Sequence, residues 1–241
     1  MPTAIDISNY SGRITARQVA CWKAAGVALV VVGTQDAAIA SQQLSMLRDG
    51  GIAREAYVYL YLSSPTAPQV QAAESIIAPY GCRRLWLDAE DDQGALSSFA
   101  VREALIAARK AVTAPLGWYT RRGWWRQATG DYQGFRADPL WDARYPAPGS
   151  DVIPAFIPYG GWTAPAMTQY HDTTTLCGVS VDLDVEEPMT PEERQQFDAV
   201  AAKVFDLQQQ VTALAQGTDS VLKGALKYLW ALARKPWPWG S

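Results

Sequence analysis

The segment LWLDAEDD, residues 85–92, places four acidic side chains directly after a run of large apolar residues. Ionised carboxylates are costly to bury, so their position at the end of a predicted core strand calls for a chemical reason. Asp88 and Glu90 are two residues apart, so they point to one side of an extended chain, and Leu85 and Leu87 point to the other. Burial and mutual repulsion raise the pKa of at least one acid in such a pair, which then holds a proton.

Two further acids, Asp6 and Asp182, lie in the first and last apolar segments that predict strands. In a closed barrel these two strands are neighbours, and the strand that carries Asp88 faces them across the mouth. Glycoside hydrolysis requires a protonated acid beside an ionised carboxylate, so Asp6, Asp88, Glu90 and Asp182 are the candidate catalytic residues. A calcium or magnesium site is the alternative, because oxygen ligands also suit those ions.

Aromatic side chains lie near the ends of several predicted strands, where flat rings with polar edges can stack on sugars. Packing inside the core is the alternative for each of them. The candidates for substrate binding are Tyr57, Tyr59, Trp118, Tyr119 and Tyr170. Tyr119 and Tyr170 end their apolar segments, which favours a place in the site.

The elements that must position these residues follow an alternating pattern. Short apolar segments rich in β-branched and aromatic residues predict eight strands, at residues 3–8, 28–34, 55–62, 83–90, 114–120, 140–145, 166–171 and 179–185. Ala-rich segments with apolar residues every three or four positions predict helices at 15–26, 37–51, 68–81 and 96–112, with a fifth, irregular helix within 121–138.

Five helical crossovers followed by three strands with short connections predict a (β/α)5β3 barrel, an incomplete TIM-like α/β fold. An open doubly wound sheet is the alternative. That fold usually carries a glycine-rich phosphate loop after its first strand, and DISNYSG lacks the pattern. The closed barrel is therefore the prediction for residues 1–187.

The composition changes near Pro188, which predicts a separate C-terminal helical segment over residues 188–241. Thr190 and Pro191 form a helix start, and apolar residues then follow in a heptad pattern from Phe197 to Leu214. A coiled coil between chains, through residues 190–235, would make a homo-oligomer, an anchor or a contact in a larger particle. A helix packed on its own barrel is the alternative.

The chain has 241 residues and a net charge of -3, so no basic footprint indicates nucleic acid. Arg121, Arg122 and Arg126 form a small basic cluster, which predicts a solvated loop. No apolar segment is long enough to span a membrane.

Histidine and cysteine are scarce. Three cysteines, Cys21, Cys82 and Cys177, are widely spaced and form no CxxC pair, so they predict buried small apolar side chains. His171 is the only histidine, which argues against a transition-metal site, and we expect no cofactor.

Several of these segments together are similar to a known family. AIDISNYSG, LWLDAE, GWYT, LWDARY, MTQY and VSVDLDV resemble, in order, the strand motifs of glycoside hydrolase family 25 lysozymes over residues 3–186. The resemblance implies an N-acetylmuramidase that cleaves the β-1,4 bond between N-acetylmuramic acid and N-acetylglucosamine in peptidoglycan. Glu90 would be the general acid/base, and Asp88 would stabilise the reacting sugar or orient its acetamido group. Asp6 and Asp182 would match the flanking acids.

The sequence departs from the family motifs at three positions, which we expect to alter the groove. Val58 stands where the family has His, Thr168 where it has Trp, and Asp184 where it has Asn. The alternative function is therefore a glycan-binding or structural subunit, for example of a phage particle, built on a weakened hydrolase barrel. The first strand follows Met1 almost directly, so we expect synthesis in the cytoplasm without a signal peptide and action at the cell wall, after lysis or from a virion.

Overall fold

The computed structural model of the chain describes residues 4–91, 96–150 and 152–186. In this part of the chain, eight strands close into a barrel in sequence order. They are β1 (Ala4–Ile7), β2 (Leu29–Gly33), β3 (Ala53–Tyr59), β4 (Leu85–Asp88), β5 (Leu116–Thr120), β6 (Leu140–Ala143), β7 (Met167–Leu176) and β8 (Val179–Glu186). Neighbours from β1 to β7 are parallel, while β8 is antiparallel to both β7 and β1. The predicted closed barrel is confirmed, and the open doubly wound sheet is wrong.

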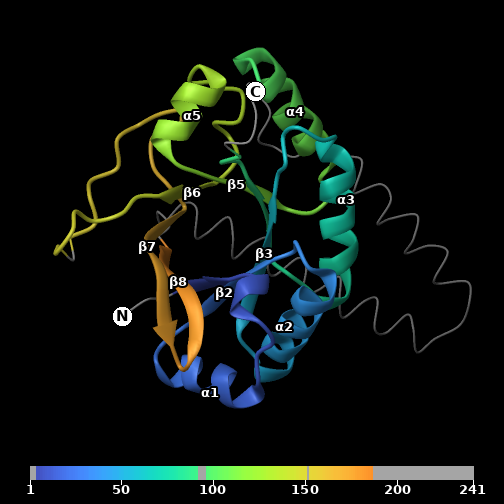
Figure 1. Cartoon of the computed structure of the whole chain (residues 1–241), viewed down its shortest axis with the longest axis vertical. Coiled ribbons are helices and arrows are strands. Elements are labelled where there is room, and N and C mark those ends of the chain that lie inside the picture. The colour runs from blue at the N-terminus through green and yellow to red at the C-terminus, as the bar shows by residue number, and fades with distance from the viewer. Residues whose placement is uncertain (1–3, 92–95, 151, 187–241) are drawn as a thin grey trace, which may run out of the picture. The chain divides into compact units, whose positions relative to one another are not determined.

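Helices cover one side of the barrel, and the strands β6 to β8 close the other side without them (Figure 1). The helices are α1 (Ala16–Ala24), α2 (Ala37–Gly50), α3 (Thr66–Ile77), α4 (Ser98–Ala111) and α5 (Arg122–Thr129), with 3-10 turns η1 (Asn9–Ser11) and η2 (Ala78–Tyr80). Side-chain caps begin three of them: Thr15 for α1, Asp36 for α2 and Ser97 for α4.

The predicted irregular helix within 121–138 is a regular two-turn helix, α5. Its buried face carries Trp124, Trp125 and Thr129. Arg122 and Arg126 are four residues apart on its exposed face, so the prediction of a solvated loop for this basic cluster is wrong. The apolar residues that recur every three or four positions hold the segment in a helix.

Apolar side chains form two separate cores, one between the barrel and its helices and one inside the barrel. Outward-facing strand residues such as Leu85 and Leu87 pack with the helices in the larger core. The smaller core fills the interior of the barrel and consists of Ala4, Leu29, Val31, Trp86, Tyr119, Trp141 and Met167. Tyr119 packs edge-on against Trp141, with ring centroids 4.5 Å apart. Aromatic side chains therefore fill much of the barrel interior.

Inward-facing positions change from apolar to polar toward the carboxyl ends of the strands. Ala4 is followed two residues later by Asp6, and Trp86 by Asp88. Because side chains alternate along a strand, each acid points into the barrel one layer above an apolar residue. The register pairs Asp6 of β1 with Asp182 of β8. The predicted meeting of the first and last strands is therefore confirmed.

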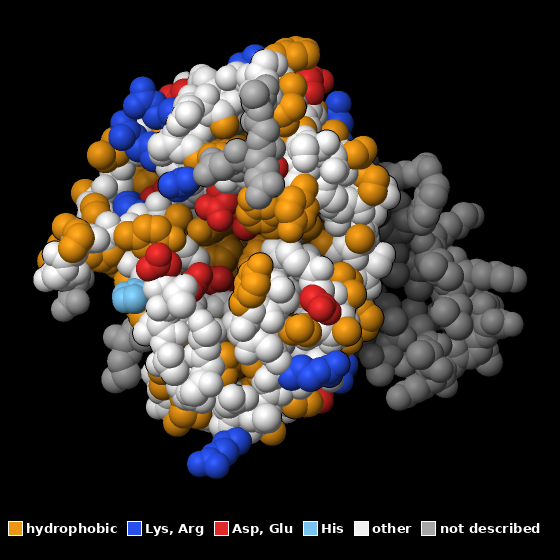
Figure 2. All heavy atoms as spheres, viewed as in Figure 1, with side chains coloured by type: hydrophobic (Ala, Val, Ile, Leu, Met, Phe, Trp, Pro, Cys, Tyr) orange, Lys and Arg blue, Asp and Glu red, His pale blue; other side chains and the backbone are white. Residues whose placement is uncertain are grey.

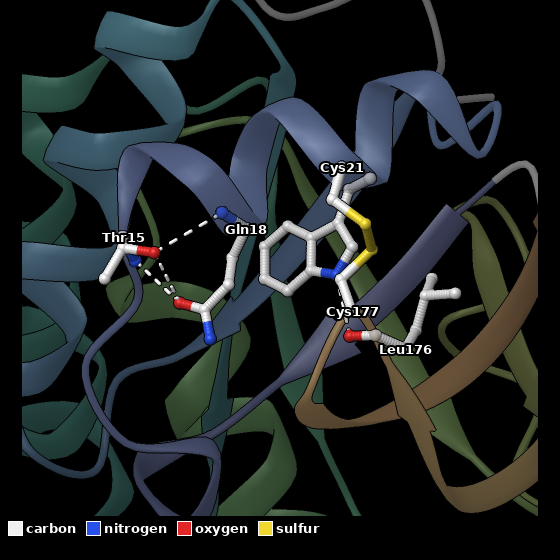
Figure 3. Close-up of a disulfide and its surroundings, with 6 residues drawn as sticks. Thr15, Gln18, Cys21, Leu176 and Cys177 are labelled. Carbon is white, nitrogen blue, oxygen red and sulfur yellow. Dashed lines mark hydrogen bonds between the residues drawn. A yellow bond between two sulfur atoms is a disulfide. The ribbon is translucent and has the colours of Figure 1, made fainter.

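A disulfide fastens the β7–β8 hairpin to the helical layer (Figure 3). It joins Cys21 of α1 to Cys177, at a sequence separation of 156 and with Cα atoms 6.1 Å apart. Trp22 supports the same junction, because its indole N–H donates to the Leu176 carbonyl at 3.2 Å. The prediction of three buried thiols is wrong for this pair, and Cys82 is the free cysteine. The pairing depends on the barrel closing, which brings α1 beside the last hairpin.

The predicted helical segment 188–241, with its heptad pattern, lies outside the described residues. Its boundary with the barrel and its role in assembly stay predictions. Over residues 4–91, 96–150 and 152–186, no helix is long and apolar enough to cross a membrane.

Candidate active site

The four predicted acids come from three places in the barrel wall. Asp6 lies on β1, Asp182 on β8 and Asp88 at the last position of β4, while Glu90 follows β4 by two residues. Figure 2 shows acidic side chains around a hollow on this face of the molecule, with apolar side chains between them. Parallel strands end at one face of a barrel, and that end is where barrel enzymes carry their active sites.

Asp6 lies at the centre of the acidic cluster. It is 6% exposed, and its Oδ2 accepts a hydrogen bond from Gln169 Nε2 at 2.8 Å. Burial, followed by the charge of Asp182, raises the pKa of Asp6 from 3.8 to about 7, although hydrogen bonds from Gln169 and Asp184 lower it. The charge of Glu90 also raises it. Acids on both sides of the mouth therefore raise the pKa of Asp6.

Asp88 has the least compensated carboxyl group of the cluster. It is 4% exposed, and its Oδ1 has no hydrogen-bond partner among the residues that the structure describes. Burial raises the pKa of Asp88 well above its usual value, and the charges of Glu90 and Asp6 raise it further. A buried carboxylate oxygen without a donor disfavours the ionised form, so Asp88 keeps its proton to a higher pH than an exposed carboxyl group does.

Glu90 is partly exposed at the rim, and the residue after it is firmly held. The Asp91 carboxylate accepts the Leu62 backbone N–H at 2.8 Å, and the Tyr59 hydroxyl lies 3.5 Å from it. The Asp91 carbonyl also accepts from the Trp124 indole at 3.3 Å. These bonds fix the end of the 85–91 segment and so restrict where Glu90 can point.

Asp184 is a fifth acid of the cluster, which the sequence analysis noted only as a departure from the family motif. It is fully buried, and its Oδ1 accepts from the Trp141 indole at 2.8 Å. Burial and the charge of Asp6 raise the pKa of Asp184 well above its usual value. Asp182, two residues earlier, is half-buried and accepts the Thr173 N–H at 2.6 Å. The D-L-D spacing in the sequence could have indicated that Asp184 belongs to the cluster, because residues two apart on a strand point to the same face.

Gln169 links the acids to two tyrosines and was also missed. Its Oε1 accepts from the hydroxyl groups of Tyr119 at 2.8 Å and Tyr145 at 2.5 Å. Its Nε2 donates to Asp6 and lies 3.4 Å from Asp182 Oδ2. All polar atoms of the amide are therefore engaged, which holds four neighbours in place. The MTQY segment was the only sequence signal for it.

Three of the five predicted substrate-binding aromatics lie beside the acids. The pKa values of Tyr57 and Tyr119 rise because of burial, and the charges of Asp6 and Asp88 contribute to both. The pKa of Tyr59 rises because of burial and the charge of Asp91. Gly33 makes room for one of these rings, since a Cβ there would lie 2.7 Å from the Tyr57 hydroxyl oxygen.

Trp118 does not belong to the site. It is fully buried in the outer core, where it stacks on Phe135 with centroids 4.4 Å apart and donates to Asp138 at 3.1 Å. The prediction that it contacts substrate is therefore wrong, because β5 turns Tyr119 inward and Trp118 toward the helices. Tyr170 is half-buried, and its role in binding stays a prediction.

Two of the three departures from the family motifs do not reach the mouth. Val58 packs in the outer core. Thr168 is fully buried and accepts a hydrogen bond from Arg144 Nη2 at 2.8 Å, on the side of β7 away from Gln169. The expectation that these two substitutions alter the groove is wrong, and only Asp184 touches the acidic cluster.

Among the described residues, no group of three or more His, Cys, Asp or Glu side chains is arranged to hold a metal ion. The acids raise one another's pKa values, which suits proton transfer to and from a substrate. A barrel with such carboxyl groups at the carboxyl ends of its strands has the architecture of a glycoside hydrolase.

The comparisons with known proteins give the family. The sequence model of glycosyl hydrolases family 25 matches residues 5–179. Probable GH family 25 lysozyme 2 of Dictyostelium discoideum is 30% identical over 197 residues, which are 76% of this chain and 89% of that protein. The chain belongs to glycosyl hydrolases family 25 and is a glycoside hydrolase.

Another relative matches part of the chain in sequence, and two solved structures share its fold. Counting factor 50 of Dictyostelium discoideum is 35% identical over 127 residues, which are 50% of this chain and 42% of that protein. A muramidase from Acremonium alcalophilum has a TM-score of 0.60 at 22% identity, over 79% of this chain and 96% of that one. The Streptomyces coelicolor lysozyme gives 0.57 at 22% identity, over 79% of this chain and 94% of that one. At these identities the two structures show the common fold.

Proposed function

We propose that this chain is a peptidoglycan hydrolase, an N-acetylmuramidase that cleaves the β-1,4 bond between N-acetylmuramic acid and N-acetylglucosamine. The observation that carries the proposal is the coupling of Asp6, Asp88 and Glu90 at the mouth of a family 25 barrel. The lysozyme name of its Dictyostelium relative supports the same substrate.

Glu90 is the general acid/base of the proposed reaction. It is partly exposed, whereas Asp88 is buried beneath the rim. A proton donor must reach the glycosidic oxygen, and the exposed carboxyl group can do so. Asp88 then faces the reacting sugar from below, where its charge or hydrogen bond stabilises the positive ring or orients the acetamido group.

Asp6 and Asp182 set the charge around this pair, and Gln169 fixes their orientation. Tyr57, Tyr59 and Tyr119 border the acids with rings and hydroxyl groups that suit a sugar. Repulsion within the cluster keeps at least one proton in the site near neutral pH, where the leaving sugar needs it.

Clearing of purified bacterial cell walls tests the proposal. Replacing Glu90 with Gln should reduce clearing about 10²- to 10⁴-fold, because the amide cannot transfer the proton. Glu103→Gln, on the exposed face of α4, is the matched control and should clear walls like the wild type. New reducing ends should be those of N-acetylmuramic acid. Wild-type protein that clears no wall, or a Glu90→Gln protein that clears as well as wild type, would contradict the function.

The heptad pattern supports a separate proposal for the C-terminal segment. Residues 190–235 would join chains to one another or to a larger particle, and so keep the barrel at the cell wall. Sedimentation of the full chain against a chain that ends at Pro188 tests this. A monomer in both cases would contradict the coiled coil between chains and leave the hydrolase untouched.

A further inference from the structure

Arg121, Arg122 and Arg126 form an exposed arginine patch at and within the start of α5. Residues 112–130 contain three Lys or Arg residues and no Asp or Glu, although the whole chain has a net charge of -3. Figure 2 shows Lys and Arg side chains gathered near α5, on the same face as the acidic hollow. The active-site face is therefore electrically divided, with acids in the centre and cations to one side.

The helix dipole explains the place of Arg126, in the last turn of α5, but not the places of Arg121 and Arg122 at its start. The helix dipole favours positive charge in the last turn, where α1, α2 and α4 all carry basic residues, although α1 also has Arg17 in its first turn. In α5, Arg121 stands at the N-cap without a side-chain hydrogen bond to the helix, and Arg122 is the first helical residue. The dipole disfavours both positions, and packing involves the opposite face, through Trp124 and Trp125. Arg122, exposed at the first helical position, fits a role in binding better than a role in folding.

The patch adjoins the catalytic segment. Arg121 directly follows Thr120, the last residue of β5. The Thr120 hydroxyl donates to the Ala89 carbonyl at 2.7 Å, and Ala89 directly precedes Glu90. The residue before Thr120 is Tyr119, which hydrogen-bonds to Gln169. The start of α5 is thus tied to the strand ends that carry Glu90 and Gln169.

We propose that the arginine patch binds an oxyanion, carboxylate or phosphate, that is attached to the glycan strand beside the bond being cleaved. Guanidinium groups pair with both anions through two parallel hydrogen bonds. The acidic mouth repels anions, so the uncharged part of the sugar chain lies over the acids and the charged substituent over α5. This separation fixes the direction of the strand and favours substituted over bare glycan. The inference rests on the proposed function for the identity of the polymer.

A sedimentation assay with insoluble cell walls tests the patch without requiring hydrolysis. All proteins carry Glu90→Gln, so that the walls stay intact during the measurement. The test variant adds Arg122→Gln and Arg126→Gln. The matched control adds Lys23→Gln and Lys110→Gln instead, two exposed charges at the C-terminal ends of α1 and α4, on the opposite rim.

At low salt, removing two exposed ion pairs should weaken binding to walls about fivefold. The difference from the Glu90→Gln parent should shrink in high salt, because salt screens exposed charges. The control should bind like the parent. The proposal would be overturned if the arginine variant bound walls like its parent at low salt, or if the lysine control lost as much wall binding as the arginine variant.

Two wall treatments identify the source of the anion. Removal of the stem peptides and reduction of the lactyl carboxylates removes carboxylate groups, and hydrofluoric acid removes phosphate polymers. The treatment that abolishes the difference in wall binding between the parent and the arginine variant identifies the anion. A difference in binding that persists after both treatments together would overturn the proposal. Wild-type protein that binds through the patch but clears no wall would contradict the hydrolase and leave the patch standing, so the two failures are distinguishable.

Discussion

Two buried carboxyl groups on neighbouring strands, Glu55 of β3 and Asp88 of β4, have opposite surroundings. Glu55 accepts the Trp86 indole N–H at 2.5 Å and lies on the side of that ring away from the mouth. Asp88 lies two residues beyond Trp86, with an oxygen that has no partner among the described residues and with acids for neighbours. Glu55 is thus stabilised by a hydrogen bond, while Asp88 is held in a state that favours a proton. Trp86 therefore lies between a carboxyl group with a structural role, Glu55, and one with a proposed catalytic role, Asp88.

Replacing Asp88 with Asn gives the largest effect that we expect. Activity should fall about a thousandfold, because an amide cannot ionise to stabilise the positive charge that develops on the sugar. Stability at neutral pH should rise at the same time, since a buried carboxyl group among acids is lost. Wall clearing and thermal unfolding measure the two results. A stability loss with unchanged activity would break the comparison.

Glu55→Leu is the counterpart. It should lower the free energy of unfolding by about 1–3 kcal/mol, because the Trp86 indole loses its acceptor inside the barrel. Activity should stay within a factor of about three, because the described bond of Glu55 is to the Trp86 indole and not to a proposed catalytic group. A thousandfold loss of activity would show that Glu55 also belongs to the site.

The disulfide separates structure from chemistry in the last hairpin. Cys21→Ser with Cys177→Ser should lower the free energy of unfolding by about 3 kcal/mol or more, because a long loop is released in the unfolded chain. Cys82→Ser, a change at the free cysteine, is the control and should have a small effect. Denaturant unfolding with and without reductant measures both, and equal stability of the two variants would contradict the prediction.

Gln169→Leu sharpens the comparison at the mouth itself. The rate should fall about 10- to 50-fold, because Asp6, Tyr119 and Tyr145 lose their shared partner. The Gln169 N–H favours the ionised form of Asp6, so its loss raises the pKa of Asp6 and moves the corresponding step of the pH–rate profile to higher pH. Gln71→Leu, on the exposed face of α3, is the control. An unshifted profile would exclude Gln169 as a positioning residue.

The smallest expected effect is on the pH dependence of stability. Folding raises the pKa of Asp6 from 3.8 to about 7 and raises those of Asp88 and Asp184 well above normal. Their protonated forms are therefore favoured in the native state, so their stabilising contribution is complete below their unfolded pKa values and is lost as the pH rises through the folded ones. The chain should be more stable at pH 5 than at pH 8.

Asp184→Asn removes one of these titrations but keeps a neutral donor beside Asp6. It should gain about 1 kcal/mol at pH 8 relative to pH 5, and activity should persist. Thermal unfolding at both values measures the gain. An equal change at the two values would show that Asp184 does not titrate in this range.

Much of the fold could be predicted because local patterns determine it. Alternating apolar strands and helical segments predicted all eight strands and the positions of α1 to α4, and the parallel order then required Asp6, Asp88 and Glu90 to share one face. Trp118 shows where this reasoning stops. The pattern LGWYT is apolar throughout, so its two faces could not be told apart until the helices covered one of them.

The sequence by itself determined the elements, the family motifs and the strand ends that carry the acids, because these depend on neighbours along the chain. Tertiary structure decided the disulfide between Cys21 and Cys177, the burial of Asp184 beside Asp6, and the reach of Gln169 to four partners. Each joins segments that are far apart in sequence. Barrel closure and strand register bring such segments together, and both arise from the packing of the whole domain.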